Sequence, residues 1–138
     1  MTDLDIASQE IPEDFRNADY GILMFVLSAI VPEKHVEVIN KIGAAMKSGG
    51  ILYFRDYSLY DMAQIRFAQK KKNKVTGNLY MRCDKTLAYY FNKEDIENLF
   101  KANGFEVVES KCICRLIENR KDNLKMHRLW LQIKLRKI

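Results

Sequence analysis

Hydrophobic residues in the first part of the chain form a run, a spaced stripe and a second run. The run from Tyr20 to Leu27 is too short for a buried helix and predicts a central strand of a parallel sheet. Pro32 suits the first turn of a helix that closes at Lys47 and Gly49-Gly50. The run from Ile51 to Phe54 predicts a second buried strand, completing a right-handed βαβ unit. The helix residues expected to face the core are Val36, Val38, Ile39, Ile42, Gly43, Ala45 and Met46.

The second part of the chain shows shorter and more varied patterns. Asn92 suits a helix N-cap, with Asp95 three residues later as a weak capping box, and Asn103-Gly104 ends that helix. Strict alternation from Leu129 to Leu135 predicts a half-buried strand. The other predicted elements are a short helix over Asp61–Ala68, a polar loop over Gln69–Gly77, a hairpin of Leu79–Met81 and Thr86–Phe91, and a strand over Phe105–Cys114 that closes the sheet antiparallel to the last strand.

Composition and charge indicate one soluble globular domain with a basic far half. The 138 residues are 48% hydrophobic and 30% charged, and the formal net charge is +5. The first third is acidic, whereas lysines and arginines gather in residues 70–74 and 134–137. A basic half suits a polyanionic partner such as nucleic acid, although a solvated face is the commoner explanation of a lysine run.

The three cysteines predict a reduced, cytoplasmic protein. Cys83, Cys112 and Cys114 cannot all pair, and no Cys or His pair has zinc-ligand spacing, so we expect free thiols and no metal. Cys112 and Cys114 share one face of a predicted strand, most simply the core face. The chain start lacks the pattern of a secretory signal, and the longest apolar run, residues 22–31, is shorter than the roughly 20 residues that span a bilayer. We therefore expect no membrane partner.

The stretch from Ile51 to Asp61 carries the candidate chemistry. An apolar strand ends there in Arg55, Asp56, Tyr57 and Tyr60. In open α/β sheets, ligands bind outside the carboxyl ends of the strands, so these side chains are expected to line a crevice. The alternative is that Arg55 and Asp56 form a structural ion pair at the strand end.

Several motifs resemble those of the tRNA 3-methylcytidine methyltransferases, members of the methyltransferase-like group. They are Phe25-Val-Leu-Ser-Ala-Ile30, the helix starting at Pro32, Phe54-Arg-Asp-Tyr57, Leu59-Tyr-Asp61 and Tyr89-Tyr-Phe91. The resemblance covers essentially the whole chain. It implies an α/β fold: the C-terminal half of a Rossmann-like class I methyltransferase sheet, with two parallel strands, an antiparallel closing pair and helices on the faces. It also implies S-adenosylmethionine as methyl donor and N3 of a cytosine in the tRNA anticodon loop as acceptor.

The resemblance assigns roles to particular positions. Asp3 and Leu4 match an acidic-Leu pair that would bind the cofactor's adenine, and Met24 matches an aliphatic position near the cofactor, although core filling would also explain it. Arg55, Asp56 and Tyr57 match the motif that flanks the cytosine pocket, where Asp56 would stabilise the positive charge of the methylated ring. Residues expected to contact the substrate RNA are Tyr60, Arg66, Lys70, Lys71 and Lys72, the basic ones through phosphates.

A glycine-rich cofactor turn is missing from these residues. We therefore expect residues 1–138 to be a single, incomplete methyltransferase domain corresponding to a C-terminal portion. Two alternatives remain open: an inactive fragment or RNA-binding remnant, and a class I methyltransferase that acts on another substrate. A missing neighbour would leave strand 20–27 with an apolar edge, so self-association through this strand is also expected.

Overall fold

The computed structural model describes residues 3–69 and 74–138. A four-stranded sheet contains β1 (Ala18–Met24), β2 (Met46–Tyr57), β7 (Leu124–Lys137) and β6 (Phe105–Asn119), in that spatial order. β1 and β2 are parallel, with Ile22 opposite Tyr53, while β7 is antiparallel to both of its neighbours. The predicted pair of parallel strands and the antiparallel closing pair are confirmed. β1 lies at an edge of this sheet, as expected for a strand with a missing neighbour, but it ends at Met24, so the prediction that it reaches Leu27 is wrong.

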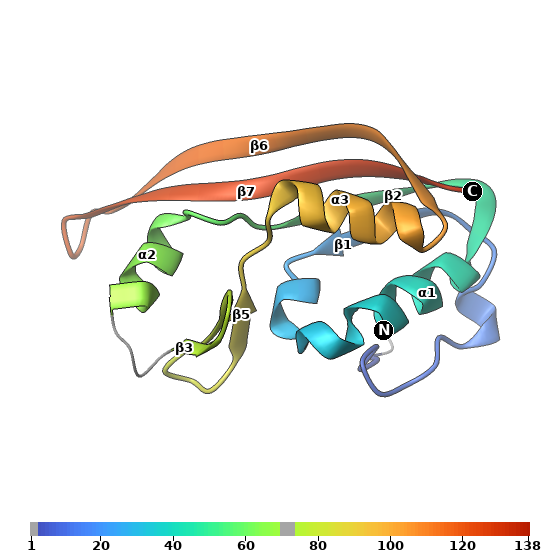
Figure 1. Cartoon of the computed structure of the whole chain (residues 1–138), viewed down its shortest axis with the longest axis horizontal. Coiled ribbons are helices and arrows are strands. Elements are labelled where there is room, and N and C mark those ends of the chain that lie inside the picture. Colours follow the sequence, from blue (N-terminus) through green and yellow to red (C-terminus); the bar gives the residue numbers. More distant parts are fainter. Residues whose placement is uncertain (1–2, 70–73) are drawn as a thin grey trace.

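The helices lie on one side of the four-stranded sheet (Figure 1). They are α1 (His35–Ala45), α2 (Met62–Gln69) and α3 (Lys93–Ala102), and three-residue 3-10 turns span Glu13–Phe15, Leu27–Ala29 and Pro32–Lys34. The core between α1, α3 and the sheet is built from apolar side chains, and each large side chain buried there stabilises the fold by about 1.5–3 kcal/mol. Its fully buried members include Leu27, Val38, Ile39, Leu52, Phe54, Ile96, Phe100, Phe105, Leu131, Ile133 and Leu135.

The predicted helices form, with two corrections in α1. Val36 was expected to face the core but is 42% exposed, because it lies on the outer side of α1, and His35 is buried instead. The helix also ends at Ala45, before Lys47, since Met46 already begins β2. The cap of α3 is confirmed: the Asp95 backbone N–H donates to Asn92 Oδ1 at 3.2 Å.

The segment between β2 and α3 forms a second, three-stranded sheet of β3 (Lys74–Thr76), β4 (Leu79–Met81) and β5 (Leu87–Tyr89). The predicted hairpin is β4 and β5, and part of the predicted polar loop is the short strand β3. Hydrogen bonds link this segment to the end of β2, since the Phe91 N–H donates to the Tyr57 carbonyl at 2.9 Å.

β6 and β7 form a long hairpin that extends beyond the rest of the molecule (Figure 1). Cys112 and Cys114 lie on this ribbon and are exposed, so the prediction that they face the core is wrong. The reason is that α3 covers β6 only near the start of the strand. None of the helices within the described residues is long and apolar enough to cross a membrane.

Candidate active site at the carboxyl ends of the parallel strands

The chain turns sharply where β1 ends. Phe25 has a φ of 55°, which a bulky residue rarely adopts, and its backbone N–H donates to the Arg55 carbonyl at 2.8 Å. This conformation carries the Phe25 ring toward two other aromatic rings, 5.1 Å from Tyr57 and 5.5 Å from Trp130 between centroids. Backbone strain of this kind concentrates at functional sites, so the turn marks the carboxyl ends of β1 and β2 as a candidate site.

Arg55 and Asp56 lie within β2 and project from opposite faces of it, because successive side chains of a strand alternate. The Asp56 side chain is fully buried on the helix-covered face. Its Oδ2 accepts from the Ser28 N–H at 3.0 Å and its Oδ1 from the Tyr57 N–H at 2.9 Å. The alternative of an Arg55–Asp56 ion pair is therefore wrong. Asp56 instead holds the turn after β1 against the end of β2, which explains why β1 stops short of Leu27.

Burial raises the pKa of the Asp56 carboxyl to about 6, because desolvation penalises the charged form. The hydrogen bonds from Ser28 and Tyr57 and the charge of Arg82 oppose this rise. The carboxyl is thus poised to change charge near neutral pH, as is common for groups in functional sites.

Arg55 lies on the other face of the sheet, beside β7. Its Nε donates to Gln132 Oε1 at 3.0 Å, its Nη2 also donates to that oxygen, and its guanidinium carbon is 5.9 Å from the centroid of Trp130. Arg55 and Met24 line one shallow pocket of about 170 Å³. Its other lining residues are Ile22, Tyr53, Phe54 and Gln132.

Tyr57 contacts two arginines. The guanidinium carbons of Arg82 and Arg128 are 5.4 and 5.3 Å from its ring centroid, and Arg82 Nη2 donates to the Tyr57 hydroxyl at 3.0 Å. Arg128 is held in turn by the fully buried Asp61, whose Oδ1 is 2.9 Å from Arg128 Nε. Phe25, Arg82 and Arg128 were not predicted as site residues, because no local pattern links them to Tyr57.

The residues predicted to bind the cofactor fall in two different places. Leu4 lines an apolar pocket of about 340 Å³ that reaches Val26, two residues after the end of β1, whereas Met24 lines the pocket that contains Arg55. Asp3 is exposed beside Leu4 in the sequence. The pocket at Leu4 is also lined by Ile6, Ile11, Pro12, Phe15 and Leu23.

Two of the residues predicted to contact RNA can be placed. The Tyr60 side chain is 75% exposed at the start of the segment leading into α2, where its backbone N–H donates to Gln64 Oε1 at 2.6 Å. Arg66 is half-buried on α2. Lys70, Lys71 and Lys72 lie outside the described residues, so their predicted contacts stay predictions.

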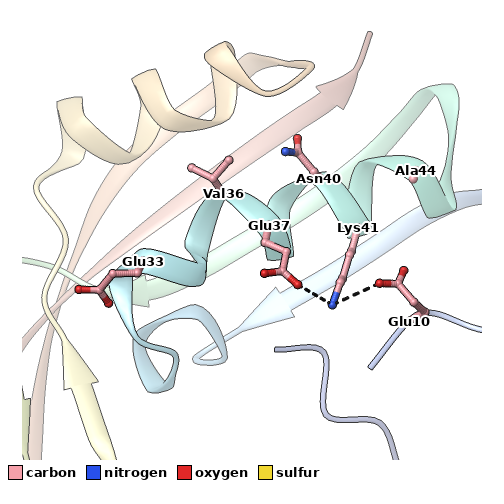
Figure 2. A pocket seen from close by; sticks show the side chains of 7 residues that line it. All are labelled: Glu10, Glu33, Val36, Glu37, Asn40, Lys41 and Ala44. Carbon is pink, nitrogen blue, oxygen red and sulfur yellow. Dashed lines mark ion pairs between the residues drawn. The ribbon is translucent and has the colours of Figure 1, made fainter. Parts of the chain in front are cut away.

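A larger hollow of about 620 Å³ lies along the outer side of α1, away from the strand ends (Figure 2). Lys41 reaches across it, 3.1 Å from Glu37 and 3.6 Å from Glu10. Its acidic lining does not suit a polyanionic ligand. Across residues 3–69 and 74–138, no group of His, Cys, Asp or Glu side chains is placed to hold a metal ion.

Comparison with known protein families identifies the family of this chain. A family model described as a methyltransferase domain matches residues 6–110. The chain belongs to the methyltransferase domain family. In this methyltransferase domain, the cluster of Phe25, Tyr57 and Trp130 lies at the strand ends where open α/β sheets bind ligands.

Curated relatives support the resemblance drawn from the motifs. The chain is 44% identical over 130 residues to "tRNA N(3)-cytidine methyltransferase METTL2" of Mus musculus, covering 94% of this chain and 32% of the relative. It is 40% identical over 136 residues to "O-methyltransferase 3" of Dictyostelium discoideum, covering 96% and 31%. The methyltransferase domain described here thus spans about a third of the length of these relatives.

A solved structure shows the same fold at low sequence identity. A SAM-dependent methyltransferase of Methanosarcina mazei matches with a TM-score of 0.69 at 14% identity, covering 98% of this chain and 65% of that structure. The predicted class of fold, part of a class I methyltransferase sheet, is confirmed.

Proposed function

We propose that this chain forms the acceptor side of an S-adenosylmethionine-dependent methyltransferase that makes 3-methylcytidine in the anticodon loop of tRNA. The observation that carries the proposal is the 44% identity, across nearly the whole chain, to a relative named for that reaction. The aromatic cluster at the strand ends provides a surface on which an unstacked base could lie. Residues 1–138 would act as a single, incomplete domain, and the tRNA substrate implies a cytoplasmic location.

The residues near the Leu4 pocket fit the adenine end of the cofactor. The pocket is apolar and large enough for a flat ring, and the exposed Asp3 carboxylate beside it could accept a hydrogen bond from an exocyclic amine. Met24 would pack at the reacting end, close to Arg55. When bound, S-adenosylmethionine supplies an electrophilic methyl group.

The protein's task in this reaction is mainly to position the acceptor. Cytosine N3 carries a lone pair, so attack needs no strong base, and catalysis depends on alignment. Phe25 and Trp130 would contact the base, whereas Arg82 and Arg128 hold the Tyr57 ring, which makes Tyr57 the fixed wall of the site. The buried Asp56 would hold the Phe25 turn from the helix-covered face of the sheet.

The tRNA would be held around this site by exposed and basic side chains. Tyr60 is exposed enough to stack on a loop base, and Arg66 with Lys70, Lys71 and Lys72 would contact phosphates. We expect binding to weaken steeply as the salt concentration rises.

Trp130 provides a direct test, since it is the single tryptophan of the chain and lies in the candidate site. An anticodon stem-loop RNA with the target cytosine should quench its fluorescence, and the same RNA with an abasic target position should not. Equal quenching, or none, would contradict the proposal. The matched control is Cys112→Ala on the exposed hairpin, which should leave quenching unchanged.

A second candidate is methyl transfer to oxygen, favoured by the similar identity to the relative named O-methyltransferase 3. The same Rossmann-like fold accepts many substrates, so the fold does not choose between the two. If the chain binds the stem-loop RNA equally well with and without the target base, this second candidate is favoured.

A further inference from the structure

The segment before β1 contains a compact hydrogen-bonded turn. The Gln9 backbone N–H donates to the Asp5 carbonyl at 2.8 Å. The Asp5 side chain closes the turn, since it accepts from the Ala7 N–H at 3.1 Å and from the Ser8 hydroxyl at 2.7 Å. A single turn leaves its later carbonyl groups without partners inside the turn, so these groups need donors from elsewhere in the molecule.

Two lysines at the start and in the middle of the α1 region supply those donors. Lys41 Nζ donates to the Ile6 carbonyl at 3.2 Å and to the Gln9 carbonyl at 3.1 Å. Lys34, directly before α1, donates to the Ala7 carbonyl at 3.3 Å. A positive charge at the carbonyl end of a turn is favourable, because the carbonyl dipoles point toward it. These lysine contacts fasten the turn to α1.

All three protons of the Lys41 ammonium have acceptors. Besides the two carbonyls, its Nζ lies 3.1 Å from Glu37 and 3.6 Å from Glu10, and the side chain is only 10% exposed (Figure 2). The hydrogen bond with Glu37 raises the pKa of Lys41, so the amine stays charged at neutral pH. Lys41 therefore holds the turn through a fixed set of partners, whereas most surface lysines are mobile.

The fastened turn forms part of the apolar pocket at Leu4. One side of this pocket comes from the segment before β1, with Leu4, Ile6 and Ile11, and the other side comes from Leu23 and Val26. Ile6 also packs against the main hydrophobic core. The lysine contacts hold the first side by its backbone, so they set its distance from the second side.

We propose that Lys41 is a positioning residue for the cofactor, which keeps the wall of the Leu4 pocket at the separation that accepts the adenine ring of S-adenosylmethionine. The inference rests on the proposed function only in the use of that cofactor. If the wall were in place about a fifth of the time without Lys41, the apparent dissociation constant would rise about fivefold, because only the competent state binds.

Lys41→Met removes the ammonium and keeps the length of the side chain. Lys41 borders the hollow of about 620 Å³ beside α1, so water can reach the freed carbonyls and Glu37. We therefore expect the variant to fold and to lose only the fixed wall. Hydrogen exchange should show this without any ligand: the Gln9 amide should exchange about tenfold faster, while the amides of α3 stay unchanged.

Adenosine is the probe for the pocket, followed by the NMR methyl signals of Leu4, Ile6 and Ile11 during a titration of the full chain. The unaltered chain should bind adenosine, and Lys41→Met should weaken binding about fivefold. Lys41→Arg keeps the charge and several N–H donors, so it should restore most of the affinity. The matched control is Lys47→Met, in the exposed pair with Asp19, which should leave the affinity unchanged.

Three results would overturn the proposal. They are the same adenosine affinity for Lys41→Met and the unaltered chain, a Lys41→Arg variant as weak as Lys41→Met, and a complete lack of binding by the unaltered chain. Adenosine reports on the cofactor pocket alone. Loss of the base-dependent quenching of Trp130 would therefore refute the proposed acceptor and leave the role of Lys41 standing.

Discussion

Replacing Asp61 with asparagine should destabilise the fold by about 3 kcal/mol. The fully buried carboxylate accepts from Arg128 Nε at 2.9 and 3.0 Å, from the Leu129 N–H at 2.7 Å and from the Ala63 N–H at 3.0 Å. An amide of the same size removes the charge and brings an NH₂ group against these donors. Breaking a buried ion pair costs about 3–5 kcal/mol, and the 18% exposure of the Arg128 side chain places the effect at the lower end.

Urea unfolding followed by Trp130 fluorescence measures this change. A loss of about 3 kcal/mol is a large part of the roughly 5–15 kcal/mol that a domain of this size has. The matched control is Glu118→Gln in the exposed pair with Lys125, where the atoms are 3.7 Å apart and the side chains 48% and 68% exposed. It should change the free energy of unfolding by less than about 0.5 kcal/mol. An Asp61→Asn effect as small as this control would refute the idea that Asp61 and Arg128 fix the wall of the site.

Three further predictions concern the turn after β1 and its surroundings. Because the pKa of Asp56 is raised to about 6 from 3.8, its stabilising contribution is present below pH 4 and lost as the pH rises through 6. Urea unfolding at several pH values should show that the free energy of unfolding falls by about 2–3 kcal/mol across this range, and Asp56→Asn should remove the fall. Burial lowers the pKa of His35 from 6.5, so the contribution of neutral His35 to the free energy of unfolding is present above pH 6.5 and is lost as the pH falls. Urea unfolding of His35→Phe over the same pH values should not show that loss. Phe25→Gly should be more stable than Phe25→Ala by about 1 kcal/mol, because alanine disfavours a φ of 55°, and equal melting temperatures would show that the turn carries no strain.

Local features of this fold could be predicted because they depend on neighbouring residues. The Asn92 cap, the parallel pairing of the strands predicted at 20–27 and 51–54, and the alternating strand 129–135 each follow from short patterns and are confirmed, although the first strand ends at Met24. The exact ends were less predictable. β2 continues through Asp56 because β7 pairs with it as far as Tyr57, and that partner lies more than seventy residues later in the sequence.

The candidate site was predicted only in part. The Phe54-Arg-Asp-Tyr57 motif indicated the correct strand end, but the burial of Asp56 depends on the Ser28 turn, which sequence periodicity does not show. The arginines beside Tyr57 come from a hairpin loop and from β7, so only the folded chain brings them together. Such contacts depend on tertiary packing and carry no local signal.

A chimera provides the most direct test of the proposed function. The matching 130 residues of the Mus musculus relative are replaced with those of this chain, and the product is incubated with S-adenosylmethionine and tRNA. Mass spectrometry of the digested nucleosides should find 3-methylcytidine, and Phe25→Ala in the chimera should reduce its rate of formation at least tenfold. Methylation at a sugar oxygen, or no methylation by a folded chimera that binds S-adenosylmethionine, would contradict the account.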